Sequence, residues 1–177
     1  MIRLKSIYLY VFIGILFCFA MDCAAFELQS RYATITYSDQ DDIRDFNKKL
    51  YMGRLQSSIR GSGNSIESEV VAKIDFIVEK VRLVLDMFPP KFKFAIVIHP
   101  GVREVQADFF KIYNVSVGYI AFYSPSRNTA FFSADNGILR VVAHEIGHVV
   151  AENYFVVSPP QRIHEVLAQF AEAHVTD

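Results

Sequence analysis

Residues 138–154 read ILRVVAHEIGHVVAENY, a strong helical pattern that contains two histidines and a glutamate in close succession. Its apolar side chains recur at the spacing of one face of an α-helix. In such a helix, His144 and His148 lie one turn apart on the same face, with Glu145 next to the first histidine. Gly147, which lies between the two histidines, indicates that another part of the chain packs closely on the helix there, since glycine costs about 1 kcal/mol in a helix relative to alanine. We therefore expect a buried helix that presents two imidazoles to one point.

The order His-Glu-x-x-His has a specific chemical meaning. Two imidazoles four residues apart can bind one zinc ion, and the glutamate between them can take a proton from a water that the metal activates. A catalytic zinc site commonly has three protein ligands and one open position. His144 and His148 supply two ligands, so the third must come from another part of the chain.

We expect the third ligand on the next helix. Ser158-Pro159-Pro160 separates the first helix from a second helical pattern that starts at Gln161, and we predict Glu165 as its ligand. His164 is the nearest alternative, but adjacent helical residues point about 100° apart, so one ion would not bind both. The remaining alternatives are a site without a third protein ligand, or one of three other side chains: Glu152, Glu172 and His174.

These residues resemble the gluzincins, the thermolysin-like and peptidase MA-like zinc peptidases, whose second helix donates a glutamate from an E-x-x-A segment. Glu165 and Ala168 match that segment, and the expected order of strands and helices also matches from about residue 31 onward. Metzincins fit poorly, because Ala151 and Tyr154 stand where that family has glycine and a third histidine. The resemblance implies a zincin-like α+β fold, with a small mixed sheet and an antiparallel hairpin packed on the two metal-binding helices.

The resemblance also implies an activity. A gluzincin is a zinc metallopeptidase that hydrolyses peptide or protein substrates, and here Glu145 would be the general base. Gluzincins usually place a tyrosine or histidine to stabilise the oxyanion, but no motif selects one among His174, Tyr154, Tyr119 and Tyr123. Gln169 follows Glu165 by one turn, where some gluzincins have an acidic residue that supports a ligand, and its side chain is either such a support or exposed.

The rest of the pattern predicts an α+β layer structure. The strands are expected at residues 31–37, 92–99, 119–123 and 129–133, and the helices at residues 41–50, 65–88 and 102–113, with a flexible loop at residues 57–65. The last two strands are expected to form a hairpin, with residues 129–133 as an edge strand that could pair with an extended substrate. His99, which ends the second strand, is interpreted as structural.

The N-terminus predicts export. Arg3 and Lys5 precede an apolar run of roughly 15 residues that ends in small side chains, which is typical of a cleaved secretory signal peptide over residues 1–25. The mature chain would be one zincin-like domain, residues 26–177, periplasmic or secreted, with a membrane anchor only if the signal is not cleaved. Both cysteines, Cys18 and Cys23, fall in the signal, so core packing and the metal would have to stabilise the domain.

Composition excludes other classes of protein. The chain has 177 residues, 52% of them hydrophobic, and a net charge of −1 without a basic cluster, so we expect one compact domain and no nucleic-acid partner.

Two alternatives to a peptidase remain. One is an exported zinc-binding scaffold that has lost catalysis, although Glu145 favours an enzyme. The other is a structural protein that binds no metal.

Overall fold

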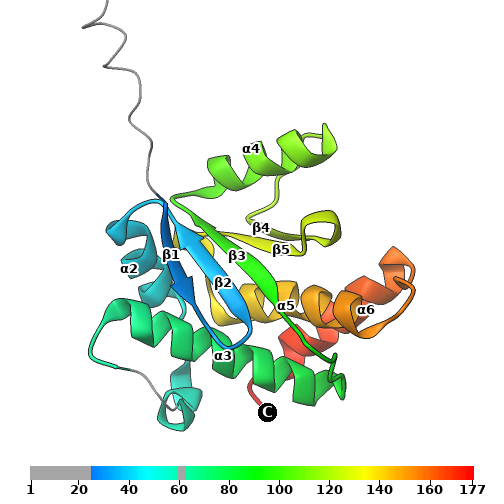
Figure 1. Ribbon diagram of the computed structural model, residues 1–177, viewed down its shortest axis with the longest axis horizontal. Helices are drawn as coiled ribbons and strands as arrows, with labels where there is room; N and C mark the ends of the chain where they lie inside the picture. The colour runs from blue at the N-terminus through cyan, green and yellow to red at the C-terminus, as the bar shows by residue number, and fades with distance from the viewer. Residues whose placement is uncertain (1–24, 60–62) are drawn as a thin grey trace, which may run out of the picture.

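The computed structural model describes residues 25–59 and 63–177. Within these residues, one sheet has the strand order β1-β2-β3-β5-β4 (Figure 1). Its strands are β1 (Phe26–Gln29), β2 (Ala33–Tyr37), β3 (Phe94–His99), β4 (Ala121–Ser124) and β5 (Thr129–Ser133). The three inner strands are parallel, and β1 and β4 are antiparallel to their neighbours. The sheet is therefore mixed, as expected.

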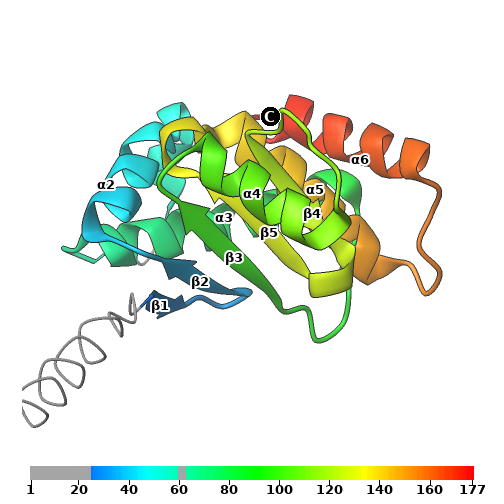
Figure 2. The same cartoon turned by 90° about the horizontal axis from the view of Figure 1, so that it is seen from above.

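Helices cover both faces of this sheet. They are α2 (Gln40–Lys49), α3 (Ile66–Leu85), α4 (Val102–Tyr113), α5 (Leu139–Tyr154) and α6 (Gln161–His174), with short 3₁₀ helices at Gly53–Ser58, Pro125–Arg127 and Ala134–Asn136. Figures 1 and 2 show α4 alone on one face, with α2, α3 and α5 on the other and α6 packed beside α5. The α+β class predicted from the sequence is confirmed.

The main core lies between the sheet and the helices α2, α3 and α5. Side chains with no exposed surface fill it from every layer, among them Ile35, Phe46, Ile74, Ile96 and Ile146. β2 and β3 alternate between buried and partly buried residues, as expected for strands whose two faces differ. A smaller cluster under α4 consists of Val105, Phe122 and Phe131. Because both of its faces are covered, all five residues of β5 are buried.

The position of β5 corrects one prediction. Residues 129–133 were expected to form an edge strand, but β5 pairs with β3 on one side and with β4 on the other. β4 is the edge strand at this end of the described sheet. The hairpin itself is confirmed. The sequence could not show which of its strands is inner, because that depends on pairing with β3, about thirty residues earlier.

Helix α3 begins as predicted but ends early. The side chain of Ser65 accepts a hydrogen bond from the backbone N–H of Ser68, which caps the first turn. The helix was expected to reach residue 88, yet it ends at Leu85, because Asp86 adopts the left-handed conformation with φ 52°. The backbone N–H of Asp86 then donates to the carbonyls of Arg82 and Leu83 in the last turn. This arrangement ends the helix before the chain reaches Pro89 and Pro90. β1 and the 3₁₀ helix at Gly53–Ser58 were not predicted.

The predicted signal peptide, residues 1–25, lies outside the described residues except for Ala25. Among the helices of the described part, none combines the length and apolar character that crossing a membrane requires.

Candidate metal centre

Helix α5 presents His144 and His148 on the same side, as the four-residue spacing requires. Their ring centroids are 4.9 Å apart. Ile138 precedes the helix without a side-chain cap, so α5 depends on burial for its stability. Its other side contributes Val142, Ile146 and Val149 to the core, which fixes the rotation of the helix about its axis. Both histidines are consequently held at the boundary between the core and a cavity.

Helix α6 brings Glu165 opposite these two rings. The Nε2 atom of His144 lies 3.7 Å from Oε2 of Glu165, and the Nε2 atom of His148 lies 3.7 Å from its Oε1. One potential ligand atom from each of the three side chains falls within 4.8 Å of the others. Among the described residues, His144, His148 and Glu165 therefore form a group that could hold a metal ion. We call this group the triad.

Close contact between the helices explains this convergence. A Cβ atom at Gly147 would lie 2.8 Å from the Cα atom of Ala168 and 3.2 Å from the Cβ atom of Ala171. Real Cβ atoms are not found so close to backbone, so any larger residue at position 147 would push α6 away. The expectation that Gly147 marks close packing is thus met, and its partners are two alanines on α6.

Glu172 contacts the ring nitrogen of His144 that does not face Glu165. Its Oε2 atom is 3.1 Å from Nδ1 of His144, and its Oε1 atom is 3.2 Å from Nε of Arg140. A carboxylate beside Nδ1 favours the tautomer with the proton there, which leaves the Nε2 lone pair directed at Glu165. Glu172 was among the alternative third ligands, but in this geometry it orients His144, a member of the triad.

Glu165 is oriented by a residue that the sequence did not suggest. Gln161, one turn earlier on α6, donates a hydrogen bond of 2.7 Å from Nε2 to Oε1 of Glu165. Gln169, one turn later, is exposed. Of the two interpretations of Gln169, the exposed side chain is therefore the correct one. The residue that contacts Glu165 lies one turn before it on α6, and not one turn after it.

The other alternative ligands are engaged elsewhere. His164 is only 6% exposed, and its Nε2 atom lies 3.0 Å from Oε2 of Glu152. Ser158 joins this pair, because its hydroxyl is 2.7 Å from the same carboxylate oxygen and 3.2 Å from Nε2 of His164. His174 directs Nδ1 at the backbone carbonyl of Phe170, 2.9 Å away. None of these three ionisable side chains belongs to the triad.

The environment keeps His148 in the form that a metal requires. Burial, together with the neighbouring His144, lowers the pKa of His148 to about 4. The ring is therefore neutral near pH 7, and its nitrogen lone pair is free to bind an ion. The donor set thus has the chemistry of a cation site: two imidazoles and a carboxylate that meet at one point.

Glu145 lies beside the triad and is largely shielded from solvent. It is 8% exposed, and burial, followed by the charge of Glu165, raises the pKa of its carboxyl group to about 8. The backbone amide of Tyr123, on the edge strand β4, acts in the opposite direction and lowers this pKa. A carboxyl group with a pKa near neutrality is suited to accepting and returning a proton.

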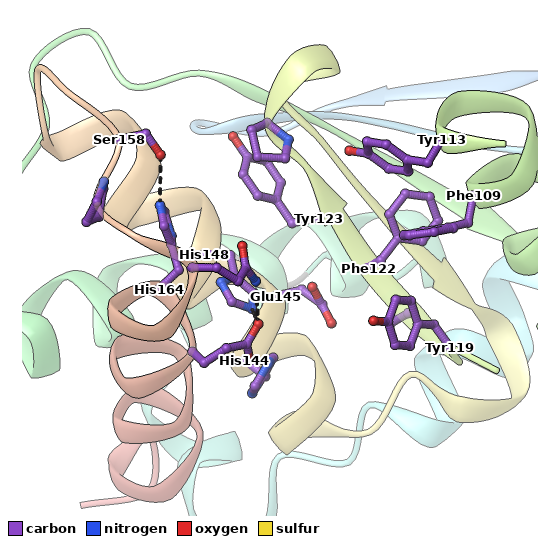
Figure 3. A pocket seen from close by; sticks show the side chains of 15 residues that line it. Phe109, Tyr113, Tyr119, Phe122, Tyr123, His144, Glu145, His148, Ser158 and His164 are labelled. Carbon is purple, nitrogen blue, oxygen red and sulfur yellow. Dashed lines mark hydrogen bonds and ion pairs between the residues drawn. The ribbon is translucent and has the colours of Figure 1, made fainter. Parts of the chain in front are cut away.

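A cavity of about 630 Å³ connects these groups to β4. Figure 3 shows His144, Glu145, His148 and His164 on one side, with Tyr123 between them and an aromatic cluster on the other side. The lining residues are Phe109, Tyr113, Tyr119, Ala121, Phe122, Tyr123, Pro125, His144, Glu145, His148, Ser158, Pro159, Gln161, His164 and Glu165. The cavity therefore extends from the triad across the edge of the sheet.

Two of the four residues considered for oxyanion stabilisation line this cavity, namely Tyr119 and Tyr123. The hydroxyl of Tyr123 donates to Oδ1 of Asn128 at 2.9 Å, and burial raises its pKa. Tyr119 is half exposed. Tyr154 and His174 are not among the lining residues. The geometry thus reduces the sequence candidates to two tyrosines near β4.

His99 lies away from the cavity, as expected. Its Nε2 atom is 2.9 Å from Oδ2 of Asp108 on α4, and its ring stacks on Phe131. The pair joins α4 to the end of β3, so His99 is a structural residue.

Sequence reasoning did not identify the roles of Gln161 and Glu172. Both face the triad from α6, four residues before and seven after Glu165, so a helical projection centred on Glu165 would have found them.

Comparisons of this chain with protein-family models, with curated proteins and with solved structures give no match. Its function must therefore be inferred from its own residues.

Proposed function

We propose that this chain is a zinc-dependent metallopeptidase of the gluzincin type with a zincin-like fold. The observation that supports this most strongly is the position of Glu145. A buried carboxyl group lines the same cavity as the triad and lies next to a strand edge to which a peptide could bind. A site that only stores or transports a metal has no need of such a group.

Zinc fits the donor set best. His144 and His148 would each bind through Nε2, and Glu165 would bind through its carboxylate, which is one of the common three-ligand sets of catalytic zinc sites. A bound zinc ion would supply Lewis acidity, lowering the pKa of water and polarising a carbonyl group. Glu172 and Gln161 would keep two of the ligands in place.

Glu145 would act as the base and then as the acid. In hydrolysis, the oxygen of a water adds to the peptide carbonyl carbon, and the released proton passes to the carboxylate of Glu145. The same proton then passes to the amide nitrogen as the C–N bond breaks, which leaves a free carboxyl group and a free amine. Glu145 must be ionised at the start, and a divalent cation close to it favours that form. The backbone amide of Tyr123 would favour the ionised form of Glu145.

The substrate would bind as an additional strand. β4 is the edge strand of the described sheet, and Ala121, Phe122 and Tyr123 of β4 all line the cavity. Main-chain hydrogen bonds to such an edge hold an extended peptide without selecting its sequence. Peptides or unfolded segments of proteins are therefore the proposed substrates. We also propose that the chain is exported through the signal peptide predicted at residues 1–25.

The Glu145→Gln variant tests this function. Gln keeps the size of the side chain but cannot take up the proton. We therefore expect wild-type zinc content and a rate of cleavage of a peptide mixture that is at least about 100-fold lower. The wild-type protein and a zinc-free sample provide the positive and negative controls. If the zinc-loaded wild type cleaves no peptide, or if Glu145→Gln keeps full activity, the peptidase proposal is wrong. The first result would favour the catalytically inactive scaffold.

A further inference from the structure

The part of the cavity farthest from the triad is aromatic. Phe109 and Tyr113 of α4, Tyr119 of the following loop and Phe122 of β4 form this wall (Figure 3). Phe109 makes edge contacts with Tyr119 and Phe122, with ring centroids at 5.2 and 5.0 Å. We call these four residues the aromatic wall. They already contact each other, so the wall is formed without a ligand.

The aromatic wall and the triad lie on opposite sides of β4. Ala121 packs into the main core on the α5 side, whereas Phe122 belongs to the cluster under α4. The cavity includes both residues, so it passes over the free edge of the strand. A peptide paired with this edge would direct successive side chains to opposite faces of the sheet. Alternate side chains would therefore meet the aromatic wall.

The wall has a definite chemical preference. No lysine, arginine, aspartate or glutamate lies among the residues that line this end of the cavity, whereas the triad end holds both carboxyl groups. A charged side chain would lose hydration there without gaining an oppositely charged partner. An aromatic or large aliphatic side chain would instead bury apolar surface and contact rings from the edge or the face.

We propose that the aromatic wall is a substrate subsite, which selects peptides with an aromatic or large aliphatic side chain close to the bond to be cleaved. This inference rests on the proposed peptidase function for the position of the cleaved bond. It adds the class of substrate and the residues that determine specificity. Tyr119 is the key position, because it is 50% exposed and therefore accessible to a ligand.

Binding tests the subsite independently of catalysis. The full-length, zinc-loaded Glu145→Gln protein is titrated with dye-labelled peptides in which Phe, Leu, Ala, Asp or Lys is moved through each position of an otherwise Gly-Ser sequence. We expect one position at which Phe binds about tenfold more tightly than Ala, with Asp and Lys weaker still. Fluorescence anisotropy measures the Kd, and the wild-type protein gives kcat/KM for the same peptides.

Three further variants identify the residues responsible. Tyr119→Ala should abolish the preference for Phe, whereas Tyr119→Phe should keep it, because the ring and not the hydroxyl makes the contact. Phe110→Ala is the matched control, since Phe110 is an exposed aromatic residue on α4 that does not line the cavity. We expect it to bind every peptide as the parent protein does. A hydroxyl role in catalysis would instead lower the kcat of Tyr119→Phe equally for all peptides.

The outcomes separate the two proposals. If Phe peptides bind preferentially but the wild type cleaves none of them, the subsite stands and the peptidase function fails. If the wild type cleaves the Phe and Ala peptides equally well at every position, the subsite is overturned while the function stands. Preferential binding that survives Tyr119→Ala, or no binding of any peptide, also overturns the subsite.

Discussion

Gly147 of α5 lies so close to Ala168 of α6 that a methyl group on Gly147 would be 2.8 Å from the Ala168 Cα atom. This contact sets the separation of the two helices that contribute the triad. His144 and His148 flank Gly147 on α5, and Glu165 precedes Ala168 by one turn on α6. The geometry of the triad therefore depends on a packing contact that includes none of its three members.

Replacing Gly147 by alanine should destabilise the protein. The added methyl group must push α6 away, which we expect to lower the free energy of unfolding by about 1–3 kcal/mol, despite the better helix propensity of alanine. Urea unfolding of the metal-free protein measures this change. Gly118→Ala is the control, because a Cβ atom there would have no neighbour within 4 Å. A Gly147→Ala protein as stable as the control would contradict the close packing.

The triad predicts which side chains set metal affinity. Glu165→Gln should weaken zinc binding by more than about 100-fold, because it removes the negative charge of the triad. His164→Gln should bind zinc as the wild type does, since His164 contacts Glu152 and Ser158 instead. Competition with a chromophoric chelator measures both affinities. The opposite order, with His164→Gln the weaker binder, would show that the third ligand is His164.

The contact between Glu172 and His144 predicts an effect on affinity without loss of a ligand. Glu172→Gln weakens the hold on Nδ1 of His144, so zinc binding should become about 10- to 100-fold weaker. His174→Ala is the matched control on the same helix, because His174 bonds only to the carbonyl of Phe170 among its described partners. Equal affinities for these two variants would mean that Glu172 does not position His144.

The metal-free protein should lose stability as the pH rises toward 8. The pKa of Glu145 is about 8 in the folded protein and 4.5 in the unfolded chain. Between these two values, the folded state therefore retains a proton that the unfolded chain releases. This contribution is complete below pH 4.5 and is lost as the pH rises through the folded pKa. His148 acts in the opposite direction, since its pKa is lowered from 6.5 to about 4, and its effect ends near pH 6.5.

Between pH 6.5 and 8, therefore, the Glu145 term should dominate the contribution of the site. We expect the free energy of unfolding to fall by up to about 1.4 kcal/mol per pH unit in that interval. Denaturant unfolding in the presence of a chelator measures it. Glu145→Gln should remove most of the slope, because glutamine does not titrate. A slope that is the same in both proteins would show that Glu145 is not the group responsible.

Residue patterns along the chain were enough to predict the two helices of the site and the three residues of the triad. Local periodicity was sufficient for α5 and α6, because apolar residues at three- and four-residue spacing favour a helix wherever it packs. The spacing of His144 and His148 placed both imidazoles on one face, and the proline pair before Gln161 indicated that the chain turns back. Glu165 followed from its place in the second helix and from the resemblance.

Which face of each element meets another depends instead on contacts between segments that lie far apart in the chain. The identity of the edge strand depended on whether β5 pairs with β3, a contact between distant residues that local pattern does not encode. The roles of Glu172 and Gln161 depended on the rotation of α6, which the contact of Gly147 with Ala168 fixes. The aromatic wall likewise joins α4 to β4 across the edge of the sheet. Such contacts arise when the core packs, and packing determines which side chains face each other across a cavity.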